Sequence, residues 1–241
     1  MTAHGLIDTT EMYLRTVFEL EEEGISPLRA RIAERLSQSG PTVSQTVARM
    51  ERDGLLHVAE GDRHLTLTDT GRELATRVMR KHRLAECLLV SVIRLPWEEV
   101  HIEACRWEHV ISESVERRLF DLLEHPEACP HGNPIPGLAE LMDAAGDPSA
   151  HGKPDEPMLD AASETTGPAS AVVTRITEHV QSDLVLMLKL KRAGIQPGRK
   201  VLLGAVKGGG VRVSAGGGES DGADATELPA DVAAHVFVSR E

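Results

Sequence analysis

The chain has 241 residues, 41% hydrophobic and 27% charged, a balance typical of a globular protein with one large domain or two to three small ones. Its apolar runs are shorter than the ~20 residues that span a bilayer, and its N-terminus does not resemble a secretory signal, which excludes a membrane partner and predicts a cytoplasmic protein. The net charge of −12 excludes a basic coat, and the three cysteines, Cys87, Cys105 and Cys129, exclude a disulfide framework.

The first third of the chain predicts a winged helix-turn-helix. Helices are expected over residues 8–23, 28–36 and 41–52, where apolar residues recur at helical spacing. Residues 55–59 and 64–68 alternate around a Glu-Gly-Asp turn and predict a β-hairpin. Helix, short helix, tight turn, helix and a two-stranded wing is the order of this DNA-binding motif.

The third helix, over residues 41–52, is expected to be the one that reads DNA. Residues 27–52 carry five arginines against two glutamates, a basic island on an acidic protein. Short polar groups at the start of the helix can reach base edges or phosphates. The residues predicted to contribute to DNA binding are Arg29, Ser39, Pro41, Thr42, Ser44, Gln45 and Arg49. The alternative is a three-helix core with a purely structural role.

Two long helices are predicted next, over residues 70–93 and 97–123, separated at Pro96. Paired amphipathic helices behind a winged helix commonly form a dimer interface. A homodimer would double a weak contact with one operator half-site.

The C-terminal part is expected to be a separate, mostly β domain. Residues 146–167 are rich in Pro, Ser, Gly, Asp and Glu and predict a linker. After it, strands are expected over 169–177, 201–206, 211–214 and 234–238, and a helix over 178–192.

The strongest chemical signal lies within the second long helix. Cys105, Glu108 and His109 stand three and four residues apart, which puts a thiol, a carboxylate and an imidazole on one face. Such donors can bind a borderline divalent metal ion. The alternative is a solvated surface cluster, as is common for glutamate and histidine on helices.

A second group of donors comes from both helices. His82 and Glu86 are four residues apart, and an antiparallel hairpin with a turn near residues 94–97 would bring them close to His101. Two helices that each present ligands at helical spacing are a stronger signal than either alone. The sequence therefore predicts a second metal site formed by His82, Glu86 and His101.

Several long motifs resemble the diphtheria-toxin-repressor family of iron-dependent regulators. They are DTTEMYLRT over 8–16, SGPTVSQTVARMERDG over 39–54, VMRKHRLAE over 78–86, EACRWEH over 103–109 and GNPIPG over 132–137. The similarity is dense over residues 6–142. The fold class that it implies is mainly α with β, in four segments. These are a winged helix-turn-helix domain over 1–73, a helical dimerisation and metal-binding domain over 74–142, a flexible linker over 143–168 and an SH3-like domain over 169–241.

The resemblance also implies ligand sets for two metal sites. An activating site would use Met12, Cys105, Glu108 and His109, and an ancillary site would use His82, Glu86 and His101 together with Glu178 and Gln181. Cys129 and His131 stand near a position where the family binds an anion, and the resemblance gives them no role.

The resulting expectation is a repressor, not an enzyme, that binds palindromic operators of iron-uptake and iron-homeostasis genes when Fe²⁺ is bound. A thioether and a thiolate favour a softer ion than Mn²⁺, and Zn²⁺, Co²⁺, Ni²⁺ and Mn²⁺ are expected to substitute in vitro. Three rivals are a thiol-based redox repressor with Cys105 as sensor, a Mn²⁺-selective regulator and a zinc hydrolase with Glu86 or Glu108 as base. The hydrolase lacks a His-Glu-x-x-His signature.

Overall fold

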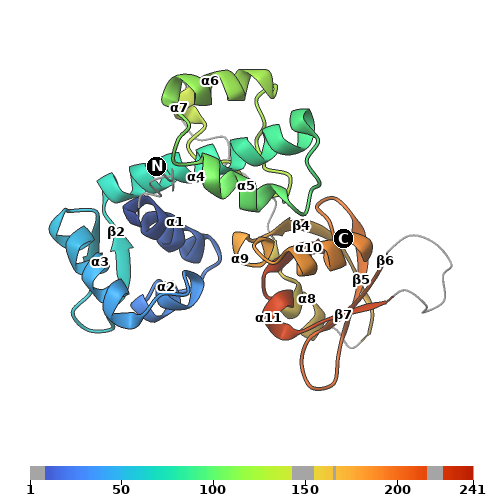
Figure 1. Ribbon diagram of the computed structural model, residues 1–241. Coiled ribbons are helices and arrows are strands. Elements are labelled where there is room, and N and C mark those ends of the chain that lie inside the picture. Colours follow the sequence, from blue (N-terminus) through green and yellow to red (C-terminus); the bar gives the residue numbers. More distant parts are fainter. Residues whose placement is uncertain (1–8, 143–154, 165–166, 216–224, 241) are drawn as a thin grey trace. The chain divides into compact units, whose positions relative to one another are not determined.

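The computed structural model describes residues 9–142, 155–164, 167–215 and 225–240, which fall into two compact units (Figure 1). The first unit takes in the described residues up to 85, together with 103–125 and 135–142. The second takes in 86–102, 126–134 and the described residues from 155 onward. Within the described ranges, each helix is too short or too polar to traverse a bilayer.

The first unit begins with the expected winged helix-turn-helix. Its helices are α1 (Thr9–Glu22), α2 (Arg29–Arg35) and α3 (Gly40–Arg52). Strands β1 (Leu56–Val58) and β2 (Leu65–Leu67) form the antiparallel wing, with Leu56 opposite Leu67. Buried apolar residues of all three helices and both strands form one core. Helix α3 begins directly after its N-cap residue, Ser39, in the turn that follows α2.

Helix α4 (Asp69–Leu88) connects the winged helix-turn-helix to the other helices of the first unit. The guanidinium of Arg83 on α4 donates to Glu22 of α1 at 3.0 Å. A buried ion pair joins Arg80 Nε to Glu116 Oε1 at 2.7 Å and so holds α6 (Glu113–Leu122) against α4. Helix α7 (Ala139–Met142) follows, where the carboxylate of Glu140 accepts from Arg80 at 3.0 Å.

Both of the long helices expected over residues 70–93 and 97–123 differ from their expected form. The helix expected over 70–93 continues past Leu88 as a π-helical turn, η1 (Leu89–Ile93), and ends at Arg94, which has φ = 65°. The helix expected over 97–123 is instead two helices, α5 (Val100–Trp107) and α6. The break occurs because Ser112 caps α6 and accepts a hydrogen bond from the Val115 amide at 3.4 Å.

The second unit contains a sheet that, among the described residues, has six strands in the order β3-β8-β4-β5-β6-β7, each antiparallel to its neighbours. Its strands are β3 (Glu156–Pro157), β4 (Ala169–Ile176), β5 (Lys200–Ala205), β6 (Val211–Ala215), β7 (Thr226–Leu228) and β8 (Val236–Arg240). Helices α8 (Met158–Ser163), α9 (Glu178–Gln181), α10 (Leu184–Arg192) and α11 (Ala230–Ala233) belong to the same unit. Here too, one expected helix over 178–192 is two, because Asp183 caps α10 through the Leu186 amide at 3.0 Å.

The linker expected over 143–168 is wrong for its middle part. Residues 156–163 form β3 and α8, and Met158, Ala161 and Ala162 are buried in the core of the second unit. Their spacing of three and four is that of a helix with one apolar face, which the Pro- and Gly-rich composition obscured. Residues 143–154 and 165–166 of the expected linker, and residues 1–8, lie outside the described residues.

Candidate metal centres and nucleic-acid interface

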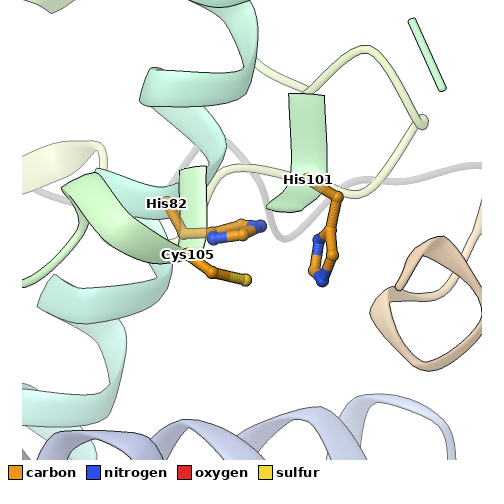
Figure 2. A group of neighbouring side chains, drawn as sticks. All are labelled: His82, His101 and Cys105. Atoms are coloured by element: carbon orange, nitrogen blue, oxygen red, sulfur yellow. The ribbon is translucent and has the colours of Figure 1, made fainter. Parts of the chain in front are cut away.

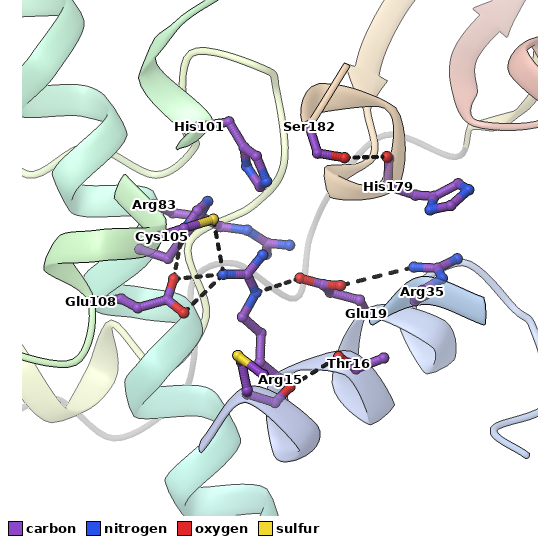
Figure 3. A network of polar contacts seen from close by, with 12 residues as sticks. Arg15, Thr16, Glu19, Arg35, Arg83, His101, Cys105, Glu108, His179 and Ser182 are labelled. Carbon is purple, nitrogen blue, oxygen red and sulfur yellow. Dashed lines mark hydrogen bonds and ion pairs between the residues drawn. The ribbon is translucent and has the colours of Figure 1, made fainter. Parts of the chain in front are cut away.

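The first candidate centre lies in the first unit, where the end of α5 faces α1. Cys105 belongs to α5, and Glu108 directly follows that helix, with its amide bonded to the Ala104 carbonyl at 3.0 Å. Arg15 of α1 donates through Nη1 to both oxygens of Glu108, at 2.8 and 2.7 Å, and to Cys105 Sγ at 3.3 Å (Figure 3). The thiol and the carboxylate thus converge on one positive charge that is delivered by the first helix.

Two histidines complete the surroundings of Glu108, whose side chain is only 1% exposed. His82 Nδ1 on α4 lies 2.6 Å from Glu108 Oε2. His109 Nε2 lies 3.2 Å from the other oxygen, and its Nδ1 lies 2.6 Å from Glu11 of α1. Glu108 is therefore the buried centre of a group that also includes Arg15, Cys105 and both imidazoles.

These contacts shift the pKa values of Glu108 and His109, each in the direction opposite to the shift that burial alone would cause. Burial alone would raise the pKa of Glu108, but the charge of Arg15 and the bond to His82 lower it to about 2. Burial alone would lower the pKa of His109, but its bond to Glu11 and the charge of Glu108 raise it above its ordinary value. The charges of the group therefore keep the Glu108 carboxylate ionised and paired with the Arg15 guanidinium.

Met12 is the fourth residue expected at this centre. It lies on α1 three residues before Arg15, on the same side of the helix, and its carbonyl accepts from Thr16 Oγ1 at 2.9 Å. Thioether, thiolate, carboxylate and imidazole together suit a borderline divalent ion. The donor chemistry therefore fits a metal, and the guanidinium of Arg15 supplies the positive charge there.

Figure 2 shows how α4 and α5 contribute further ligand atoms. His82 extends from α4, and a nitrogen of its ring lies within 4.8 Å of Cys105 Sγ. His101 lies one turn before Cys105 on α5. His82 is expected at the ancillary site, yet within the first unit it bonds Glu108, which is expected at the activating site.

The second candidate centre lies in the second unit and is built around Glu86, which is fully buried. One carboxylate oxygen of Glu86 lies 3.4 Å from His101 Nδ1, and the other lies 3.2 Å from His131 Nδ1. Cys129 also offers its Sγ within 4.8 Å of Glu86 and His131 ligand atoms. Of these residues, only Glu86 and His101 were expected as ligands.

Glu178 and Gln181, the remaining expected ligands, are both buried on the short helix α9. Gln181 Nε2 donates to the Ile176 carbonyl at 2.7 Å, which also accepts from Asn133 Nδ2 at 2.8 Å. The Ile176 amide in turn donates to the His131 carbonyl at 2.9 Å. Gln181 therefore lies beside the loop that carries His131, and among the described residues its Oε1 has no hydrogen-bond partner. A buried acceptor without a donor fits a site for a cation.

The predicted DNA-reading residues lie mainly on the exposed face of α3. Pro41, Thr42, Ser44, Gln45 and Arg49 are all exposed. Ser39, also exposed, caps the helix by accepting from the Thr42 amide at 3.4 Å, and the two hydroxyls lie 2.8 Å apart. Arg29 is half-buried at the start of α2, and its Nε has no hydrogen-bond partner within the described part of the chain.

Sequence reasoning missed Arg15 and Glu11 and gave no role to Cys129 and His131. Glu11, Arg15 and Glu19 follow one another at steps of four along α1, so they share a face, and this spacing was the available signal. No local pattern indicated that Arg15 would meet Glu108, 93 positions away in the chain.

Comparisons with known proteins agree with this arrangement. Residues 5–65 match the family described as "Iron dependent repressor, N-terminal DNA binding domain", and residues 68–137 match "Iron dependent repressor, metal binding and dimerisation domain". The iron-dependent repressor IdeR of Mycobacterium tuberculosis is 57% identical over 236 residues, covering 98% of each chain. The diphtheria toxin repressor of Corynebacterium diphtheriae is 57% identical over 196 residues, covering 81% of this chain and 84% of that protein.

Solved structures with the same fold include IdeR of T. acidophilum, with a TM-score of 0.72 at 28% identity, covering 97% of this chain and 98% of that one. The apo form of the manganese-activated repressor ScaR has a TM-score of 0.73 at 26% identity, covering 95% and 99%. With its winged helix-turn-helix, its helical metal-binding and dimerisation region and its antiparallel-sheet domain, the chain belongs to the iron-dependent repressor family of non-enzymatic transcriptional regulators.

Proposed function

We propose that this protein is a dimeric, Fe²⁺-activated repressor that acts in the cytoplasm on palindromic operators of iron-uptake and iron-homeostasis genes. The observation that carries the proposal is that Cys105 and Glu108, at the end of α5, bind the guanidinium of Arg15 on α1. Arg15 belongs to the DNA-binding domain, whereas Cys105 and Glu108 belong to the metal-binding domain. A cation bound at this point ties the two domains together.

In the proposed activating site, Met12, Cys105, Glu108 and His109 hold the ion. The ion would supply a divalent positive charge to the thiolate and to Glu108. Glu108 is suited to this role because its buried carboxylate already accepts from a cationic group, the Arg15 guanidinium, at 2.8 and 2.7 Å. His109 would bind through one ring nitrogen while Glu11, 2.6 Å from Nδ1, orients the ring through the other. Because Met12 lies on α1, the site constrains the helix that begins the DNA-binding domain.

In the proposed ancillary site, His82, Glu86 and His101 bind a second ion, with Glu178 and Gln181 contributed by the C-terminal domain. All five side chains are at least 95% buried, and the carboxamide oxygen of Gln181 has no hydrogen-bond partner among the described residues. Burial of the Gln181 oxygen without a hydrogen bond is costly, and a bound cation would offset that cost. This site would help to hold the C-terminal domain in place.

On DNA, α3 is the proposed reading helix. Ser44 and Gln45 would contact base edges, while Ser39, Pro41 and Thr42 at the helix N-terminus would lie against a phosphate. Arg29 and Arg49 would add phosphate contacts that do not depend on the base sequence. The dimer would place two such helices on the two halves of a palindrome. Exposed apolar side chains at Val110, Val115 and Leu122 are suited to contribute to the dimer interface.

Fe²⁺ is proposed over Mn²⁺ because two of the four activating donors are sulfur. Two solved structures of the same fold are described as a manganese-dependent transcriptional repressor and as a manganese regulator, and Mn²⁺ prefers oxygen and imidazole donors. Zn²⁺, Co²⁺ and Ni²⁺ bind such a site more tightly than Fe²⁺ in the general order of affinities, so selection in the cell would rest on availability.

The decisive experiment is a titration of metal-free protein with Fe²⁺ in the absence of oxygen, with operator binding followed by fluorescence anisotropy. Operator affinity should rise by roughly 5- to 150-fold, the usual size of an allosteric coupling. A parallel titration with Mn²⁺ tests the metal preference. Full-strength operator binding by verified metal-free protein would exclude the proposed switch.

A thiol-based sensor is the second candidate, and one contact favours it. Arg15 lies 3.3 Å from Cys105 Sγ, and a neighbouring cation stabilises a reactive thiolate. Cys105→Asp separates the two functions, because a carboxylate can bind a metal ion but cannot be oxidised like a thiol. A metal switch should keep metal-dependent operator binding with altered metal preference, whereas a thiol sensor should lose its response.

A further inference from the structure

The loop of residues 126–134 brings a thiol and an imidazole to the buried carboxylate of Glu86. Cys129 Sγ, a ring nitrogen of His131 and an oxygen of Glu86 all lie within 4.8 Å of one another. His101 Nδ1 lies 3.4 Å from the second oxygen of the same carboxylate. All four residues belong to the second unit.

These donors are almost completely shielded from water. Cys129, His131 and Glu86 are 5%, 0% and 0% exposed. His131 lies near Glu86, yet neither of its ring nitrogens makes a hydrogen bond within the described part of the chain. Burial of an imidazole without hydrogen bonds is costly, and a metal ion bound to a ring nitrogen would offset that cost.

The loop is held firmly in the conformation that presents these donors. The Cys129 amide donates to the Asn133 carbonyl at 2.9 Å, and Trp97 Nε1 donates to the Pro130 carbonyl at 2.9 Å. The Trp97 ring also packs on His131, with centroids 4.9 Å apart. Gly132 has φ = 85°, and a Cβ there would lie 2.0 Å from the Thr174 carbonyl oxygen, so the backbone lies directly against β4. Such support around a ligand set is typical of metal sites.

We propose that Cys129 and His131, with Glu86 and His101, form a thiolate-containing site for Zn²⁺ or Fe²⁺. The proposal rests on the proposed function in that it shares Glu86 and His101 with the ancillary site, so a tetrahedral ion bound here would replace, and not accompany, an ion bound with His82, Glu178 and Gln181. Metal bonds of 2.0–2.3 Å put tetrahedral ligand atoms about 3.3–3.8 Å apart, so closing from within 4.8 Å takes small side-chain movements. Cys129 would lose its proton to solvent as the thiolate binds.

The thiolate changes which ions the centre in the second unit would prefer. A site of carboxylate, imidazole and amide oxygen accepts Mn²⁺ readily, whereas a cysteine ligand favours Zn²⁺, Co²⁺ and Fe²⁺. Cys129 and His131 are therefore specificity-determining ligands of this centre. Both proposed metal centres of the protein would then contain sulfur.

The test uses the full chain and Co²⁺, whose thiolate complexes have a near-ultraviolet charge-transfer band. The Cys105→Ser variant removes the only thiolate proposed for the activating centre, whose other sulfur donor is the Met12 thioether, so a thiolate band that remains reports on Cys129. We expect the band in C105S, its loss in C105S/C129S and its retention in C105S/C87S. Cys87 is the matched control because it is also a buried thiol of the second unit, directed at the Ala128 carbonyl.

Absence of the band in C105S at saturating Co²⁺, or its persistence in C105S/C129S, would overturn the proposal. His131→Phe gives an independent measurement, because phenylalanine keeps a ring against Trp97 but has no ligand atom. Zn²⁺ affinity of the centre should fall by roughly 10- to 100-fold in H131F, with thermal unfolding of the chelated protein as the check on folding. Unchanged Zn²⁺ affinity in a folded H131F would exclude His131 as a ligand.

The outcomes separate this proposal from the proposed function. Failure of the thiolate site alone would leave Fe²⁺-dependent operator binding intact in the unaltered chain. Failure of the metal switch would appear as operator binding that is independent of metal, whatever the Co²⁺ spectrum of C105S.

Discussion

At the scale of single residues, Arg15 is the most informative side chain in the structure. It is 13% exposed and gives its charge to Cys105, Glu108 and Glu19 at once. A metal ion bound by Cys105 and Glu108 would have to replace that charge. Arg15 therefore competes with the proposed activator for the same two ligands.

Arg15→Gln tests this competition. Without the guanidinium, Glu108 keeps, among the described residues, only the imidazoles of His82 and His109 as partners, so the unfolding free energy of metal-free protein should fall by up to about 3 kcal/mol. Fe²⁺ affinity should rise by about tenfold, because no cation has to be displaced. Urea denaturation and an anaerobic Fe²⁺ titration measure the two effects. Arg77→Gln is the control, since that exposed pair with Glu73 contributes about 1 kcal/mol or less; weaker Fe²⁺ binding in R15Q would contradict the competition.

Met12→Ala tests the link between the two domains. Loss of the thioether should weaken Fe²⁺-dependent operator binding by at least about tenfold, the effect expected even for an outer-shell partner of a metal. The dimer, measured by sedimentation, should persist because Met12 lies on α1 and not in the dimerisation domain. Met142→Ala, at an exposed methionine of α7, should behave as the unaltered chain. Normal metal-dependent repression by M12A would show that Met12 on α1 does not help to bind the activating ion.

At the scale of elements, short caps decide where helices end. The apolar pattern over residues 97–123 continues without a break, yet the structure divides it at residues 108–112. The Ser112 hydroxyl and carbonyl accept the Val115 and Glu116 amides, at 3.4 and 2.9 Å, and so begin a new helix. The division matters because it leaves Glu108 and His109 just beyond the end of α5, where they face α1.

Ser112→Ala measures the contribution of this cap. The free energy of unfolding should fall by about 1 kcal/mol, because one amide at the start of α6 loses its acceptor. Urea denaturation of chelated protein is the measurement. Ser114→Ala removes only the contact of its hydroxyl with the Ser112 hydroxyl, 3.1 Å away, leaves the cap in place and should change stability by less than ~0.5 kcal/mol. Equal losses in both variants would mean that the Ser112 cap does not stabilise α6.

Substitutions on α2 and α3 test which residues read the base sequence of the operator and which bind DNA of any sequence. Gln45→Ala should reduce discrimination between operator and altered operators by about 1–3 kcal/mol, because an exposed amide on α3 can pair with a base edge. Arg29→Ala should instead weaken binding to all DNA alike and lower the salt slope by about one. Binding isotherms at several salt concentrations distinguish the two. Identical behaviour of the variants would mean that α3 is not the reading helix.

At the scale of the whole molecule, the proposed repressor couples two binding events. If metal tightens operator binding by a given factor, operator must tighten metal binding by the same factor, since the two effects share one coupling free energy. Co²⁺ affinity measured with and without operator DNA should therefore differ by the factor found in the DNA titration, within roughly 5- to 150-fold. DNA of scrambled sequence is the control. A Co²⁺ affinity that is the same with and without operator DNA would contradict the coupled model of repression.

Local pattern was enough to predict the DNA-binding first third of the chain and part of the candidate sites. The three helices and the wing lie within a few residues of their expected bounds. Helical periodicity and turn chemistry act over three or four residues, so they can be read without knowledge of the fold. The same periodicity placed Cys105, Glu108 and His109 near one another, and the comparisons bear out the family that these motifs indicated.

Tertiary structure alone decided which partners those residues meet. Arg15 bonds Glu108 from 93 positions away, and Glu86 lies beside His131 from a distant loop. Residues of the expected linker joined the core of the second unit as α8. A repeat of 3.6 residues determines which face of a helix is buried, but not which segment packs on it. That choice depends on how distant surfaces fit together and on which buried charges find an opposite charge.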